Sequence, residues 1–156
     1  MRTGTTWLVA IACGLTAQAA IAADFKEIQL WLSSGSGSQG FAALPDGTLE
    51  NVKLGELQKL EHERCARATR DEMELLNRLV GQIPANAPWE REWIAPDDCS
   101  DELEASLYVT AVRGKLSVHY SLQCMPANVP RWVTEFVNAM RELQAKYAAC
   151  SSLLNH

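Results

Sequence analysis

The fold of this chain is decided by LEASLYVTAVRGKLSVHYSLQC, residues 103–124. With Arg113-Gly114 as a two-residue turn, the two arms form an antiparallel hairpin in which Leu107 pairs with Tyr120. Side chains alternate between the faces of a strand, so this register gathers the apolar ones on one face: Leu103, Ala105, Leu107, Val109, Ala111, Leu116, Val118, Tyr120, Leu122 and Cys124. The other face is more polar, and a slip of one residue would exchange the two faces.

The segment after the hairpin predicts a helix that covers this apolar face. Asn128 is a candidate N-cap, and Pro130 suits the first helical turn. Apolar residues then recur at spacings of four and three, the pattern of an amphipathic helix: Val129, Val133, Phe136, Met140, Leu143, Tyr147 and Cys150.

Residues 25–53 predict strands joined by a loop and a turn. Phe25–Ser34 alternates as a strand does, with Trp31 on the outward face. Ser33–Gly40 has no large side chain and three glycines, which predicts a flexible or tightly turning loop. Pro45-Asp46-Gly47 is a turn signal, and Thr48–Lys53 is either a further strand or a lead into a helix.

Residues 54–83 predict helical structure. The stretch is rich in helix formers and in charge, and its periodicity permits one helix or two. Thr69 and Glu72 form a capping-box pattern, which would place a break near Ala68. Pro84 ends the run.

Pro84–Ser100 is rich in proline and reads as irregular chain, in which one helical turn would direct Trp89 and Trp93 to the core. Strands and helices are thus partly segregated along the sequence. This order favours an α+β fold, a small antiparallel sheet covered on one face by two or three helices and braced by two disulfides.

Residues 1–22 have the pattern of a secretory signal peptide. Arg2 precedes the apolar run WLVAIACGL, and Ala20-Ile21-Ala22 fits a signal peptidase site. The run is too short to span a membrane permanently. The residues before Cys13 fit a lipoprotein signal poorly, so we favour cleavage after Ala22 and a periplasmic or secreted location. Residues 23–156 then predict a single domain.

The mature chain is acidic. Removing Arg2 from the 14 basic side chains leaves 13, against 19 acidic ones, for a net charge of −6. A negative net charge repels polyanions, so it argues against nucleic acid or an anionic membrane surface as the main partner.

Four cysteines remain in the mature chain, and an even number in an exported protein predicts two disulfides. Cys124 and Cys150 flank a helix of about 20 residues, which separates them by ~30 Å, too far for a bond. Cys99 precedes one hairpin strand and Cys124 ends the other. We therefore prefer Cys99–Cys124 with Cys65–Cys150 over Cys65–Cys124 with Cys99–Cys150.

The search for catalytic or metal-binding residues points to a protein that is not an enzyme. The chain lacks a G-x-S-x-G motif, and its cysteines are better explained as disulfides than as nucleophiles. His62 precedes Cys65 at a spacing that can bind metal, but a surface histidine near a bonded cysteine is the preferred interpretation. The acidic run at residues 97–104 lacks the EF-hand spacing. We predict no metal and no cofactor, and a hydrolase with a carboxylate pair has no support.

The Ser/Gly loop is the strongest candidate for recognition of a partner. It lacks the phosphate-binding G-x-x-x-x-G-K-[ST] pattern. Its small residues would allow close backbone approach in a partner's cleft. Trp31 would anchor such a contact, although packing under a neighbouring loop is the slightly favoured interpretation.

The order of the predicted strands, loop and helices resembles that of the emfourin family, small bacterial protein inhibitors of thermolysin-like metalloproteases. The resemblance rests on the strand at residues 28–32, the Ser34-Gly35-Ser36-Gly37 loop with Gly40-Phe41, the Leu-rich stretch to Val80, the hairpin and the closing helix. It covers roughly residues 28–145, although the signal peptide, the four cysteines and the alternating glycines depart from the family pattern. The resemblance implies a loop that contacts a metalloprotease through Trp31, Ser34, Gly35, Ser36, Gly37 and Phe41.

The resulting functional hypothesis is an exported, non-enzymatic binding protein that inhibits a protease through the Gly/Ser loop at residues 33–40. The alternative is a periplasmic immunity protein or a subunit of an envelope assembly, whose acidic surface would contact a basic partner. The oligomeric state is open.

Overall fold

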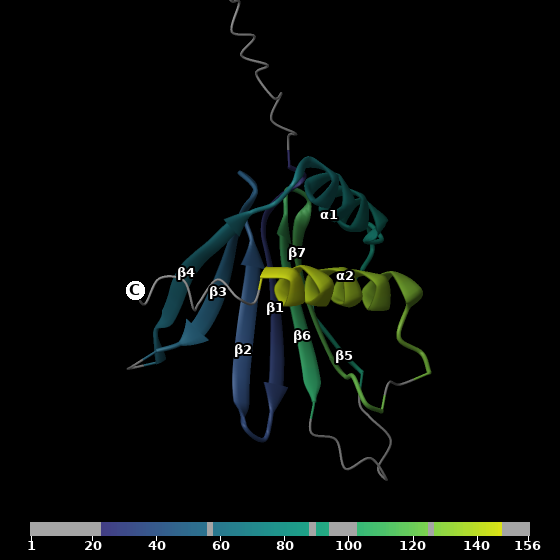
Figure 1. The fold of residues 1–156 in the computed structure, drawn as a ribbon. Helices are drawn as coiled ribbons and strands as arrows, with labels where there is room; N and C mark the ends of the chain where they lie inside the picture. The colour runs from purple at the N-terminus through teal and green to yellow at the C-terminus, as the bar shows by residue number, and fades with distance from the viewer. Residues whose placement is uncertain (1–22, 56–57, 88–89, 94–102, 125–126, 148–156) are drawn as a thin grey trace, which may run out of the picture.

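The computed structural model describes residues 23–55, 58–87, 90–93, 103–124 and 127–147, with backbone only for 90–93. Seven strands form one sheet in the order β4-β3-β2-β1-β6-β7-β5 (Figure 1). The strands are β1 (Phe25–Ser34), β2 (Gly37–Ala43), β3 (Thr48–Leu54), β4 (Leu60–Arg67), β5 (Glu90–Trp93), β6 (Glu104–Ala111) and β7 (Gly114–Ser121). Neighbouring strands are antiparallel except for β5, which runs parallel to β7.

Two helices, α1 (Arg70–Gln82) and α2 (Arg131–Tyr147), pack on the same face of the sheet. Figure 1 shows α2 crossing the middle of the sheet, with α1 near the end where β1 begins. Their buried residues join one face of the strands in a single core, which includes Ile28, Leu30, Phe41, Leu49, Leu76, Val80, Leu107, Val109, Val118, Phe136 and Met140. Neither described helix is long and apolar enough to cross a membrane.

The predicted fold, a small antiparallel sheet under two or three helices, is wrong. The sheet has seven strands and includes a parallel pair, and the described residues form only two helices. No disulfide joins two of the described residues. The helices therefore cover part of a sheet that is much wider than the sequence pattern indicated.

Residues 54–67 account for most of that extra width. The predicted helical stretch contains the end of β3 and all of β4, and only its second half forms α1. β4 is an edge strand rich in charged side chains, as edges that resist further pairing are, so it lacks the apolar alternation by which strands are recognised. The predicted capping box at Thr69 and Glu72 is confirmed, and α1 ends before Pro84.

The β6–β7 hairpin is displaced from its predicted register by two residues. Leu107 pairs with Val118 instead of Tyr120, and the turn residues are Val112 and Arg113. A shift of two keeps every side chain on its face, so the apolar and polar faces form as expected. Gly114 enters β7 at φ 152°, a conformation that favours glycine.

The proline-rich segment after α1 also contains an unpredicted strand. Glu90–Trp93 pairs with β7, so the expected helical turn at Trp93 is wrong, and Trp89 lies outside the described residues. A four-residue strand is too short to show periodicity, and its pairing depends on an edge that only the folded sheet provides.

The predicted disulfides each include a cysteine outside the described residues, Cys99 or Cys150. Cys124 is disulfide-bonded, and its partner is not Cys65, which excludes the alternative Cys65–Cys124 pairing. The thiol of Cys65 lies 3.2 Å from the backbone oxygen of Tyr147, at the end of α2 and three residues before Cys150. The preferred pairings therefore stay predictions.

Peptide mapping tests these pairings directly. We expect a non-reducing digest of the mature protein to contain linked peptides for Cys99–Cys124 and for Cys65–Cys150, because Cys65 lies beside the helix end that leads to Cys150. Mass spectrometry before and after reduction checks this. A linked Cys99–Cys150 peptide would contradict both pairings.

Candidate functional site

The Ser/Gly segment forms the tip of the β1–β2 hairpin. Ser34 pairs with Gly37, so Gly35 and Ser36 alone make the turn, and the rest of the segment belongs to the strands. The tight-turn alternative is therefore confirmed. Figure 1 shows this tip at the end of the sheet away from α1.

Serine hydroxyl groups brace the tip. The Oγ atoms of Ser33 and Ser38 lie 2.9 Å apart across the hairpin, and those of Ser34 and Ser36 lie 2.8 Å apart. The Ser36 amide also donates to Ser34 Oγ at 3.3 Å. A Cβ atom added at Gly35 or Gly37 would meet nothing within 4 Å, so the space around the turn is open. The tip is thus exposed, uncharged and locally ordered.

The structure separates the predicted contact residues into two groups. Gly35, Ser36 and Gly37 are exposed at the tip, and Ser34 is half-buried beside them. Phe41 is fully buried on the helix-covered face, where it pairs with Leu30. Phe41 therefore belongs to the core and offers no surface to a partner.

Trp31 lies on the uncovered face of the sheet, half-buried. Its indole N–H donates to Gln29 Oε1 at 3.2 Å, and its ring lies over Gly40, the opposite residue on β2. A Cβ atom at Gly40 would be 3.0 Å from the Trp31 ring and 2.9 Å from Val52 Cβ. The glycine thus lets the indole pack against β2 and β3. Trp31 therefore packs against neighbouring strands, and not under a neighbouring loop as the favoured interpretation of the sequence had it.

A hydroxyl–imidazole network on the same face was missed by the sequence analysis. His119 Nε2 lies 2.8 Å from Ser117 Oγ, and His119 Nδ1 lies 2.8 Å from Ser106 Oγ. Tyr108 meets the imidazole edge-on at 5.4 Å between ring centroids and is 39% exposed. The alternation of β7 in the sequence indicates that Ser117 and His119 share a face. Ser106 lies beside them only in the observed β6–β7 register, in which it pairs with His119.

This network is suited to recognition more than to proton transfer. Both ring nitrogens of His119 contact serine hydroxyls, and among the described side chains no carboxylate orients the ring as a catalytic base requires. The described residues also contain no group of three or more metal-ligating side chains. His62 is the residue that the sequence suggests as an alternative metal ligand. Its Nδ1 atom lies 2.9 Å from Oε2 of Glu50 on the adjacent strand.

Comparisons with protein-family models and with curated proteins find no match for this chain. The hairpin tip and the uncovered face are therefore the features from which a function can be inferred.

Proposed function

We propose that this chain is an exported, non-enzymatic binding protein that inhibits a protease through the tip of the β1–β2 hairpin. The observation that carries the proposal is the tip itself, an exposed two-residue turn of small side chains braced by serine hydroxyls. An inhibitor of this kind needs a backbone segment that can enter a cleft without being remodelled.

Pre-organisation supports tight binding at such a tip. A flexible loop loses conformational freedom on association, and this loss opposes binding. The Ser33–Ser38 and Ser34–Ser36 contacts already restrict the tip before any partner arrives. Open space around Gly35 and Gly37 leaves the backbone accessible to a protease cleft.

The chemistry of the tip is compatible with a metalloprotease as the partner, the class implied by the resemblance to emfourins. The tip carries no charge between Ser33 and Gln39, so its entry into an apolar cleft leaves no unpaired ion. Trp31 lies on β1, three residues before Ser34 at the tip. On the uncovered face of the sheet, it would lie at the edge of the surface that contacts the protease.

A pair of glycine variants tests the proposal. Gly35→Arg places a long side chain at the tip, where nothing lies within 4 Å, so the fold should tolerate it. We expect the mature, oxidised protein to inhibit a thermolysin-like metalloprotease, and Gly35→Arg to weaken inhibition by roughly 30-fold or more, the effect of losing a hot spot. Residual protease activity against inhibitor concentration gives this ratio.

Gly81→Arg is the matched control. Gly81 lies in α1, also with nothing within 4 Å of an added Cβ, and the new side chain is far from the tip. Its inhibition constant should equal that of the wild type. Equal inhibition by all three proteins would remove the tip from the mechanism, and no inhibition across a panel of such proteases would refute the inhibitor proposal.

The alternative is an interaction protein of the immunity or envelope-assembly kind, which the uncovered sheet face favours. Trp31, Tyr108 and His119 present aromatic surface there, as protein interfaces commonly do. Under this alternative, capture of a partner from envelope extract would be lost in Tyr108→Ala and retained in Gly35→Arg.

A further inference from the structure

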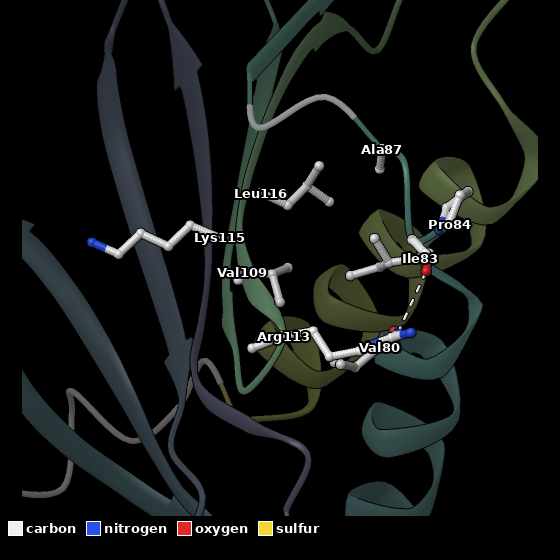
Figure 2. Close-up of a pocket in the computed structure, with 11 residues that line it drawn as sticks. Val80, Ile83, Pro84, Ala87, Val109, Arg113, Lys115 and Leu116 are labelled. Carbon is white, nitrogen blue, oxygen red and sulfur yellow. Dashed lines mark hydrogen bonds between the residues drawn. The ribbon is translucent and has the colours of Figure 1, made fainter.

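A cavity of about 160 Å³ lies between the β6–β7 hairpin and the carboxyl end of α1. It is at the opposite end of the sheet from the hairpin tip, because the start of β1 pairs with the end of β6. Figure 2 shows the side chains of Val109, Leu116 and Ile83 directed into this space. Val80 and Ala111 complete an apolar wall, and the exposed residues Pro84 and Ala85 form a rim open to solvent.

The size of the cavity limits what it can hold. An apolar protein cavity of about 150 Å³ is large enough to bind benzene. The space here therefore suits a single ring or a short branched chain, and it excludes long lipids and peptides as occupants of the cavity itself. Its apolar wall favours a hydrocarbon group over water.

Arg113 adds a fixed cation to the edge of the cavity. Its Nη2 donates to the backbone oxygens of Val80 at 3.2 Å and of Ile83 at 3.5 Å, so the end of α1 holds the guanidinium in place. Within the described residues, Nε and Nη1 of Arg113 have no hydrogen-bond partner, and these atoms carry three further N–H donors. Lys115, the other charged lining residue, points away from the cavity (Figure 2).

We propose that this cavity is a binding site for a small organic carboxylate with an apolar body of about the size of a benzene ring. The hydrocarbon group fills the space between Leu116 and Ile83, and the carboxylate accepts hydrogen bonds from Arg113. Guanidinium is suited to this task because its planar donors match the two oxygens of a carboxylate. The site is independent of the proposed inhibitory tip.

Phenylacetate and its neutral analogue phenylacetamide test the site. We expect phenylacetate to bind the mature protein saturably, with a Kd in the millimolar range typical of so small a ligand, and phenylacetamide to bind more weakly. Titration followed by amide NMR should shift the signals of Val80, Ile83 and Leu116 first. Shifts confined to the hairpin tip, or no saturation, would overturn the proposal.

Three variants separate the apolar and charged halves of the site. Arg113→Gln should weaken phenylacetate binding by roughly tenfold, since it removes a charge-assisted hydrogen bond between two ions. It should weaken phenylacetamide binding much less, because the neutral amide forms no ion pair with Arg113. Ala111→Leu fills the cavity and should abolish binding of both compounds. Lys115→Gln, the matched control, removes a neighbouring charge that faces elsewhere and should change neither Kd.

Circular dichroism of each variant distinguishes loss of the site from loss of the fold, since Arg113 also supports the end of α1. Equal weakening by Arg113→Gln and Lys115→Gln in folded proteins would show general charge attraction and refute the site. Unchanged binding in a folded Ala111→Leu would place the ligand outside the cavity and refute it as well.

Discussion

Replacing Phe136 with alanine is expected to lower the free energy of unfolding by ~3–5 kcal/mol. Phe136 is fully buried at the middle of α2, in the core shared by both helices and the sheet. Removing the ring loses its transfer free energy and leaves a cavity, because the surrounding core, which draws on both helices and the sheet, can only partly close around it. Urea denaturation of the wild type and the variant measures the difference.

Asn138→Ala is the matched control for this prediction. Asn138 lies two residues further along α2 and is exposed, so its change should stay within ~0.5 kcal/mol. A similarly small loss for Phe136→Ala would mean that the apolar stripe of α2 does not face the core.

Elements with a strong local signal were predictable from the sequence. β1 has the predicted bounds Phe25–Ser34 because its side chains alternate from Ile28 onward, although an irregularity in register between Phe25 and Glu27 interrupts the alternation near its start. α2 follows its apolar stripe. The capping box at Thr69 and Glu72 correctly marks the start of α1. In each case the physical signal, a periodicity or a cap, lies within the segment itself.

Elements defined by their neighbours were not predictable in this way. β4 and β5 are edge strands, and a charged or very short edge carries no periodicity of its own. The β6–β7 register could be shifted by two without disturbing either face, so the apolar pattern alone did not distinguish the two registers. In the observed turn, the side chain of Arg113 contacts the end of α1, which lies 30 residues away in sequence and so is not part of the local pattern.

The candidate site also contains features with a local sequence signal and features that depend on neighbouring strands. The sequence indicated an exposed Ser/Gly turn, because small residues and glycines are a local property. It did not indicate that Phe41 belongs to the core, since its orientation depends on its pairing with Leu30. The His119 network joins residues 13 positions apart and forms only when β6 and β7 are in the observed register.

Glu72→Gln is expected to destabilise the protein by about 1.5–3 kcal/mol at pH 7, the range for hydrogen bonds to a charged group. The Glu72 carboxylate accepts hydrogen bonds from the Thr69 amide at 2.6 Å, from Lys146 Nζ at 2.6 Å and from the Tyr147 hydroxyl at 3.1 Å. It thus joins the start of α1 to the end of α2. Glutamine keeps the shape of the side chain but loses the charge that makes these contacts strong.

The pH dependence of this effect follows from the pKa of Glu72. Burial raises that pKa, but the hydrogen bonds from Lys146, Thr69 and Tyr147 outweigh burial, so the pKa in the folded protein lies below the ordinary value. A lowered pKa means that the stabilisation is present above the pKa of the unfolded chain and is lost as the pH falls through the folded value. The stability difference between the wild type and Glu72→Gln should therefore shrink on acidification.

Urea denaturation at pH 7 and at about pH 3 measures this difference, with Glu74→Gln as the control. Glu74 pairs with Arg70 on the same helix, but both side chains are more than half exposed, so its loss should cost under ~1 kcal/mol at either pH. A destabilisation by Glu72→Gln of the same size at both pH values would show that the ionised carboxylate is not what joins the two helices. If Glu72→Gln lowers the free energy of unfolding at pH 7 but not at acidic pH, the ionised carboxylate is the group that connects α1 to α2, the two helices that close the core over the sheet.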